Sequence, residues 1–221
     1  MSSLVSIDIG LRTLSIYKEY FDIDKAKKIP FTKTTCDKNG LATEEYKKYV
    51  DEVSKCGTTV FLIKTDLGEM KDYYSGKALL TLFLFLDDLN KKGIFDDVQK
   101  FIIERQLTKN SIATALMFHI QSWIIINFGS FKKVILFPAK NKTRILGAPL
   151  KVENNGKLEK VNKAFRKKWS VMRTYQILKY RNEENTIDYI FTDNKSKKDD
   201  LTDVIVQCLA YNILVIKGKR K

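Results

Sequence analysis

The sequence is poor in the residues that build nucleophilic, disulfide and zinc sites. Its 221 residues include one histidine, His119, and three cysteines. A single histidine gives little support to a serine-histidine type of catalytic site. The three cysteines are far apart and form no C-x-x-C pattern, which argues against a zinc site or a disulfide framework. We therefore expect an intracellular protein of a reducing compartment.

Long uninterrupted apolar segments and targeting patterns are also lacking. The nearest approach to a membrane span is the segment 111–128, which contains His119, Gln121 and Asn127. The first residues, MSSLVSIDIG, show neither the basic and apolar regions of a signal peptide nor an arginine-rich amphipathic presequence. We expect no membrane partner.

Negative charge is scarce in only one part of the chain. The whole sequence has 40 Lys and Arg against 26 Asp and Glu, a formal net charge of +14. Residues 132–198 contain 18 basic residues against 6 acids, whereas residues 1–131 contain 18 against 17. A basic surplus confined to one block predicts a surface for a polyanion such as nucleic acid, rather than general solubility.

The apolar pattern predicts an α/β fold. Strands are expected at 4–8, 13–20, 29–34, 59–64, 101–104 and 134–137, the first two joined by a hairpin at Gly10. Helices are expected at 43–53, 75–92 (with Ser75 as cap), 110–128, 161–180 and 199–217, with a loop at 147–156. Strands come first and then alternate with helices, which predicts a mixed sheet with helices on its faces. Residues 1–221 are expected to form one domain.

Four acids stand at the ends of these elements. Asp8 and Glu104 each close a strand, and Asp200 and Asp203 share one face at the start of the last helix. Taken singly, such acids are more often ordinary polar groups or complements to a helix dipole, which suffices for Asp199. Four carboxylates can converge only around a cation, and oxygen ligands without His or Cys suit Mg²⁺ or Mn²⁺. Two metal ions on carboxylates are typical of phosphodiester cleavage.

Three segments carry a family resemblance. IDIG (7–10), FIIERQ (101–106) and KKDDLTD (197–203) resemble, in order and spacing, the RuvC-like Holliday junction resolvases of the ribonuclease H-like superfamily. The poxvirus resolvases are the most similar branch, followed by the fungal mitochondrial ones. The resemblance implies a ribonuclease H-like fold and a site with two Mg²⁺ ions, which Mn²⁺ can replace. Its catalytic, metal-binding acids would be Asp8, Glu104, Asp200 and Asp203.

The resemblance also implies a function. One metal ion would activate a water and the other would stabilise the leaving 3′ oxygen. Paired symmetric nicks would resolve four-way DNA junctions during DNA recombination and the resolution of replication concatemers. Two symmetric cuts imply a homodimer, in which the helix 110–128 is either a core helix or the interface. The missing presequence favours a cytoplasmic viral replication site in an infected cell, with the mitochondrion as the alternative.

Basic residues near the acids are the candidate DNA contacts. Lys197 and Lys198 would lie beside the scissile phosphate. The other candidates come from the basic block: Lys140, Lys142, Arg144, Lys163, Arg166, Lys167, Lys168 and Arg173.

Two other functions remain open from the sequence. An actin-like ATP-dependent kinase would also begin with a strand ending in D-x-G, as IDIGLRT does. The chain shows no second such phosphate loop and no glycine-rich adenosine loop, so we expect no nucleotide cofactor. A non-catalytic module that binds nucleic acid would explain the charge but not the acids.

Overall fold

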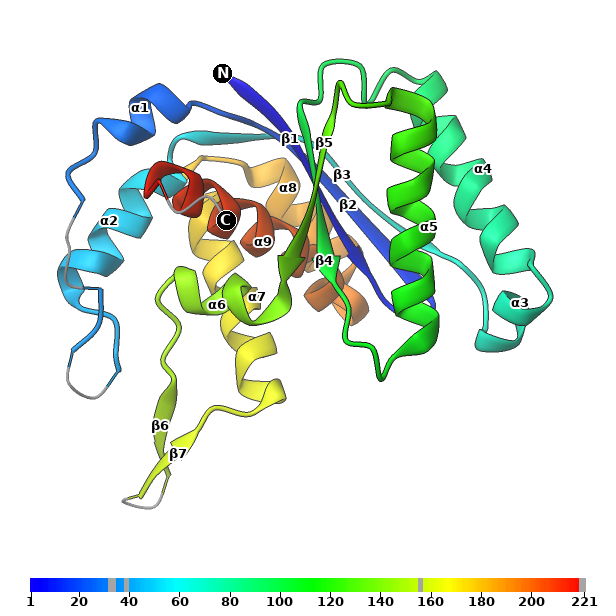
Figure 1. The fold of residues 1–221 in the computed structure, drawn as a ribbon. Coiled ribbons are helices and arrows are strands. Elements are labelled where there is room, and N and C mark those ends of the chain that lie inside the picture. The colour runs from blue at the N-terminus through cyan, green and yellow to red at the C-terminus, as the bar shows by residue number, and fades with distance from the viewer. Residues whose placement is uncertain (32–34, 38–39, 155–156, 219–221) are drawn as a thin grey trace.

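The computed structural model describes the chain except for residues 32–34, 38–39, 155–156 and 219–221. Its centre is a five-stranded sheet in the order β3-β2-β1-β4-β5 (Figure 1). The strands β1 (Ser2–Ile9), β2 (Thr13–Phe21) and β3 (Gly57–Asp66) form an antiparallel meander. β4 (Lys100–Arg105) and β5 (Lys133–Pro138) continue the sheet parallel to β1. This mixed sheet confirms the α/β prediction.

Helices cover both faces of the sheet. On one face α9 (Lys198–Ile216) packs with α2 (Glu44–Ser54) and α7 (Lys163–Tyr180). On the other face α4 (Lys77–Lys91) and α5 (Ser111–Phe128) form a second core. Each sheet face therefore has its own apolar layer, so alternate strand residues are buried on both sides.

Shorter elements join these layers. They are α1 (Ile23–Lys27), α3 (Met70–Tyr74), α6 (Ala139–Ile145), α8 (Glu184–Asp188), a π-helical turn (Tyr189–Asp193) and a 3₁₀ turn (Lys195–Lys197). A separate two-stranded hairpin consists of β6 (Lys151–Asn154) and β7 (Lys157–Lys160). It projects below the ends of β4 and β5 (Figure 1).

Three local predictions differ from the structure. Residues 29–31 form no strand, and the rest of the expected strand, 32–34, lies outside the described residues. The expected loop 147–156 contains β6. Ser75 ends α3 instead of capping α4, because the chain makes an additional helical turn before it and α4 begins after Gly76, whose φ is 79°.

α5 is the one helix in the described parts of the chain whose length and apolar composition would suit a membrane span. Leu116, Ile120 and Trp123 on one of its sides are buried in the core that covers the sheet. A core helix of a globular protein shows the same pattern.

Candidate active site

Asp8 and Glu104 lie side by side because their strands are parallel neighbours. The register of β1 and β4 pairs Ile7 with Ile103, one residue before each acid. Side chains alternate along a strand, and Leu4 and Ile102 belong to the core under α9. Both acids therefore point to the α9 face, and their carboxyl groups are hydrogen-bonded to each other.

α9 supplies the other two acids at the same edge. Its position on the sheet is set by Gln207, a fully buried residue one helical turn after Asp203. The Gln207 side-chain amide donates to the Ser6 hydroxyl at 3.0 Å, the Ile7 carbonyl at 3.1 Å and the Ile102 carbonyl at 3.0 Å. These bonds hold the helix against β1 and β4 next to Asp8. The sequence signal for this role was one amide in an otherwise apolar helix segment.

Lys142 lies among the acids. Its Nζ is 3.4 Å from Asp8 Oδ1, 3.0 Å from Glu104 Oε2 and 3.6 Å from Asp203 Oδ2. Only 4% of the residue is exposed. Contrary to the sequence prediction, Lys142 is thus not part of the exposed basic surface. The short helix α6 turns it inward over the end of β5, where three carboxyl groups surround its ammonium.

Asp200 and Asp199 have different surroundings. Asp200 Oδ2 accepts a hydrogen bond from the Thr13 hydroxyl at 3.2 Å, which places it at the start of β2 beside Asp8. The Asp199 carboxylate pairs with Lys167 and also bonds to backbone groups of its own helical turn. Asp199 therefore bonds to the first turn of α9, whereas Asp200 faces the acid cluster.

Burial changes the proton affinities of the cluster. Burial, together with neighbouring Glu104 and against the effect of Lys142, raises the pKa of Asp8 to about 7. Burial also raises the pKa of Asp203 and of Asp200. For Glu104, burial acts upward, but Lys142 and the hydrogen bond from Asp8 outweigh it and lower the pKa. Asp8 is therefore the acid of this pair that holds a proton below neutral pH.

The donor set fits a hard divalent cation by chemistry. All four acids offer oxygen only, which is what Mg²⁺ and Mn²⁺ prefer. In this conformation, however, no group of three or more Asp, Glu, His or Cys side chains among the described residues is arranged around a metal position. Three of the carboxyl groups instead surround the Lys142 ammonium, which occupies the space between them. Metal binding would require Lys142 to give up part of these contacts.

The remaining basic candidates divide into exposed and buried groups. Arg173 is only 8% exposed and pairs with Asp51 at 2.6 Å, so it too lies off the exposed surface where we expected it. Lys198 is half-buried above the ring of Phe191, and Lys167 forms an ion pair with Asp199. The exposed candidates are Lys140, Arg144, Lys163, Arg166, Lys168 and Lys197.

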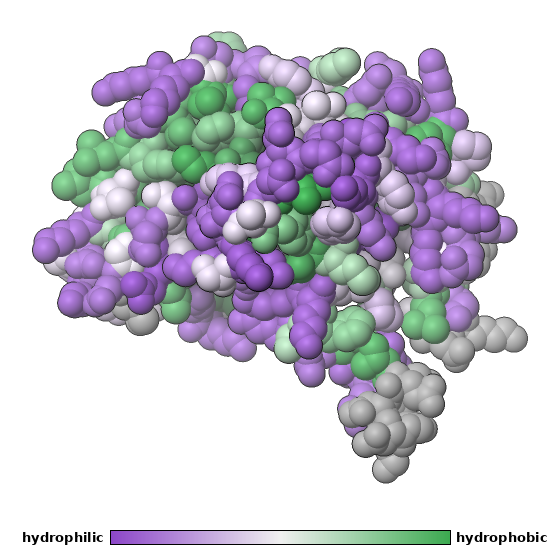
Figure 2. All heavy atoms as spheres, turned by 180° about the vertical axis from the view of Figure 1, so that it is seen from behind, coloured by the Kyte–Doolittle hydropathy of each residue, from purple (hydrophilic) through white to green (hydrophobic). Residues whose placement is uncertain are grey.

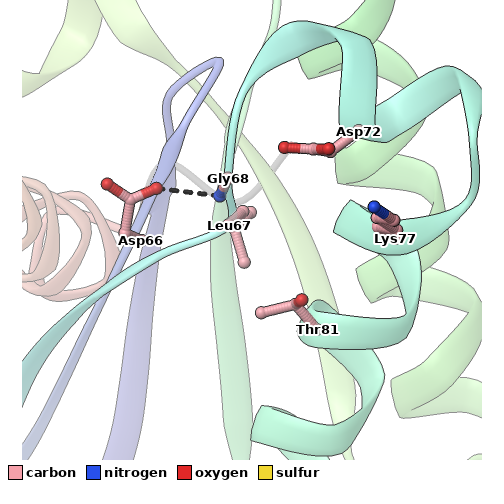
Figure 3. A pocket seen from close by; sticks show the side chains of 6 residues that line it. All are labelled: Asp66, Leu67, Gly68, Asp72, Lys77 and Thr81. Carbon is pink, nitrogen blue, oxygen red and sulfur yellow. Dashed lines mark hydrogen bonds between the residues drawn. The ribbon is translucent and has the colours of Figure 1, made fainter.

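A hollow of about 510 Å³ lies at the end of β3, beside α3 and α4 (Figure 3). It contains none of the four acids. Its carboxylates already bind backbone groups: Asp66 accepts from Gly68 N at 2.8 Å, and Asp72 accepts from Glu69 N at 2.7 Å. We interpret both as turn and cap residues.

The chain is similar in sequence to viral proteins and similar in fold to a solved structure. No family model matches the chain. The chain is 32% identical over 157 residues to uncharacterized protein 170L of Invertebrate iridescent virus 6, covering 66% of this chain and 62% of the relative. It is 30% identical over 120 residues to uncharacterized protein 97L of Invertebrate iridescent virus 3, covering 54% and 51%. The matches thus span less than two thirds of either relative's length.

One solved structure is similar over nearly its whole length. It is the crystal structure of the fowlpox virus resolvase in complex with its substrate Holliday junction DNA. The TM-score is 0.51 with 16% sequence identity, and the match covers 96% of this chain and 98% of the resolvase chain. The chain therefore shares the fold of that solved structure, and its five-stranded mixed sheet with helices on both faces is the ribonuclease H-like fold that the sequence motifs predicted.

Proposed function

We propose that this protein is a metal-dependent endodeoxyribonuclease that resolves four-way DNA junctions by paired symmetric nicks. The observation that carries the proposal is the convergence of Asp8, Glu104, Asp200 and Asp203 at one edge of the sheet. The fold adds support, since the similar fowlpox resolvase has a Holliday junction as its substrate. Residues 1–221 would form a single nuclease domain.

The chain's own residues account for the chemistry as follows. The four acids would hold two Mg²⁺ or Mn²⁺ ions, which when bound supply a nucleophilic water and charge stabilisation at the phosphodiester. Asp8 must lose its proton before it can serve as a ligand, since metal-binding carboxylates are ionised. Lys142 would neutralise the cluster from inside, and Lys197, exposed just before α9, would bind the DNA phosphate.

Two symmetric cuts require two sites, so we propose a C2 homodimer. Its interface would be the apolar surface of α4 and α5, whose exposed members are Leu80, Leu84, Phe118, Ile125 and Ile126. Figure 2 shows apolar side chains gathered on this side of the molecule. Exposed apolar areas of this kind often mark protein–protein contacts.

The biological setting follows from the relatives, which are proteins of two iridescent viruses. We propose a viral protein that acts at a cytoplasmic replication site in infected cells. There it would serve DNA recombination and the resolution of replication concatemers.

The proposal is tested with a labelled four-way junction incubated with Mg²⁺ or Mn²⁺. We expect metal-dependent nicks at symmetric positions in two opposite strands, and little cleavage of a linear duplex with the same sequence. Binding without cleavage under all metal conditions would contradict the enzyme and favour a non-catalytic DNA-binding module.

A further inference from the structure

The hairpin β6–β7 lies in the chain between two helices that both contribute to the acid cluster. It follows α6, which carries Lys142, and precedes α7, from which Ser170 hydrogen-bonds Asp203. Both connections are short, and each contains a residue with a backbone hydrogen bond. Ala148 N donates to the Thr143 carbonyl at 3.0 Å, and Val161 N donates to the Leu150 carbonyl at 3.2 Å. The base of the hairpin is therefore closed by a backbone bond of its own and is joined by short segments to the two helices that flank the site.

The base of the hairpin concentrates positive charge. The register pairs Lys151 directly with Lys160, and both are exposed. Side chains directly opposite each other share one face of the hairpin, and like charges in that position destabilise it. Among the side chains that the structure describes, neither lysine has a carboxylate within ion-pair distance. An isolated two-stranded hairpin is itself marginally stable in water, so an anion between the lysines would stabilise it.

The basic surface continues from the hairpin onto α7. Lys163, Arg166 and Lys168 are exposed in the first two turns of that helix, which begins two residues after β7. Each hairpin strand has four residues and is therefore about 13 Å long, at roughly 3.4 Å per residue. A projection of this length would leave room for DNA on either side. A linear duplex bound at the acids would occupy one side only, whereas a branched molecule would have a second arm for the other.

We propose that the hairpin β6–β7 binds the phosphate backbone of the DNA arm next to the arm being cut, through Lys151 and Lys160. It thereby makes the protein prefer branched over linear DNA. The inference rests on the proposed function for the identity of the substrate. Lysines bind phosphates without reading bases, so the preference concerns the shape of the DNA and not its sequence.

The test compares two double variants without divalent metal, so that binding is measured alone. Lys151→Ala with Lys160→Ala removes the hairpin charges. Lys91→Ala with Lys133→Ala removes two equally exposed charges, at the end of α4 and the start of β5, away from the hairpin. Fluorescence anisotropy with a four-way junction, and with a linear duplex of one arm's sequence, is recorded over a range of salt concentrations.

We expect the hairpin variant to bind the junction about tenfold more weakly at moderate salt, and its salt slope to fall by about 2, one for each lost phosphate contact. Binding to the linear duplex should change no more than in the control variant. Equal losses on junction and duplex, or a loss no larger than the control's, would overturn the inference. Circular dichroism checks that both variants are folded.

The two proposals fail separately in this design. If the wild type cleaves junctions with Mg²⁺ and the hairpin variant keeps its preference for them, only the role of the hairpin is wrong. If the wild type never cleaves but the hairpin variant loses the preference for junctions, the nuclease proposal is wrong and the hairpin contact stands.

Discussion

Lys142 Nζ lies 3.0 Å from Glu104 Oε2, at the centre of a cluster that also includes Asp8 and Asp203. Burial disfavours the Lys142 ammonium, yet the three carboxyl groups raise its pKa above the ordinary value. The lysine therefore remains charged and balances the acids from within. This relationship explains how the acids can stay close together when no metal ion is bound.

Replacing Lys142 should destabilise the metal-free protein. In Lys142→Met the carboxyl groups lose their counter-ion, and breaking a buried pair in this way costs about 3 kcal/mol or more in the free energy of unfolding. Urea unfolding in the presence of a chelator measures the loss, and Mg²⁺ should stabilise the variant more than the wild type. Lys140→Met, an exposed residue of the same helix, is the control and should change little. Equal stability of Lys142→Met and wild type without metal would contradict the role of Lys142.

Stability should depend on pH through Asp8. Its pKa is raised from 3.8 to about 7 on folding, so between these values the folded chain binds a proton that the unfolded chain lacks. This contribution is fully present below about pH 4 and is lost as pH rises through about 7. The Asp8→Asn side chain does not ionise, so the variant shows no such loss of stability as pH rises. The difference in unfolding free energy between variant and wild type, without metal, should therefore shift in favour of the variant from pH 5 to pH 8. A constant difference would show that the Asp8 pKa is not raised.

The exposed lysines of α7 should dominate the salt dependence of junction binding. Lys163→Ala, Lys167→Ala and Lys168→Ala together should weaken binding and flatten the slope of log affinity against log salt by about 2 to 3. Lys167 contributes least because it already pairs with Asp199. Anisotropy titrations measure the slope, with Lys91, Lys92 and Lys133 changed to Ala as the control. An unchanged slope would place the DNA-binding face elsewhere.

The proposed dimer can be broken at one residue. Ile126 on α5 is 81% exposed, and Ile126→Glu would place a charge in the apolar interface, where an unpaired charge is costly. Sedimentation analysis should show monomers, and the variant should nick junctions singly instead of in pairs. Met172→Glu, an exposed apolar position on α7, should remain dimeric. A dimeric Ile126→Glu variant would exclude this interface.

Much of the site could be anticipated from local patterns. An acid that closes a buried strand points to one sheet edge, and i,i+3 acids share a helix face. Asp8, Glu104, Asp200 and Asp203 could therefore be grouped from the sequence alone. Lys142 could not be singled out. The segment AKNKTRI offers three basic residues of similar chemistry, and only the turn of α6 over the sheet buries one of them among the acids.

Gln207, Arg173 and the β6–β7 hairpin escaped prediction for related reasons. α9 contains two buried amides, Gln207 and Asn212, and their residue type alone does not show that Gln207 binds two strands at once. The partner of Arg173 is Asp51, far away in sequence on α2. The strands of the hairpin are only four residues long, too short for alternation to stand out from a loop. For Gln207 and Arg173, tertiary packing, which local patterns do not encode, decided the outcome.

The central claim is tested most directly by comparing two single variants, Asp200→Asn and Asp199→Asn. The rate at which each cleaves a labelled four-way junction in Mg²⁺ is measured. The two carboxylates are neighbours, but Asp200 faces the acid cluster and Asp199 pairs with Lys167 outside it. We predict that Asp200→Asn cleaves at least about 100-fold more slowly while binding the junction as tightly as the wild type, and that Asp199→Asn cleaves nearly normally. Cleavage by Asp200→Asn at the wild-type rate would contradict the acid cluster as the active site.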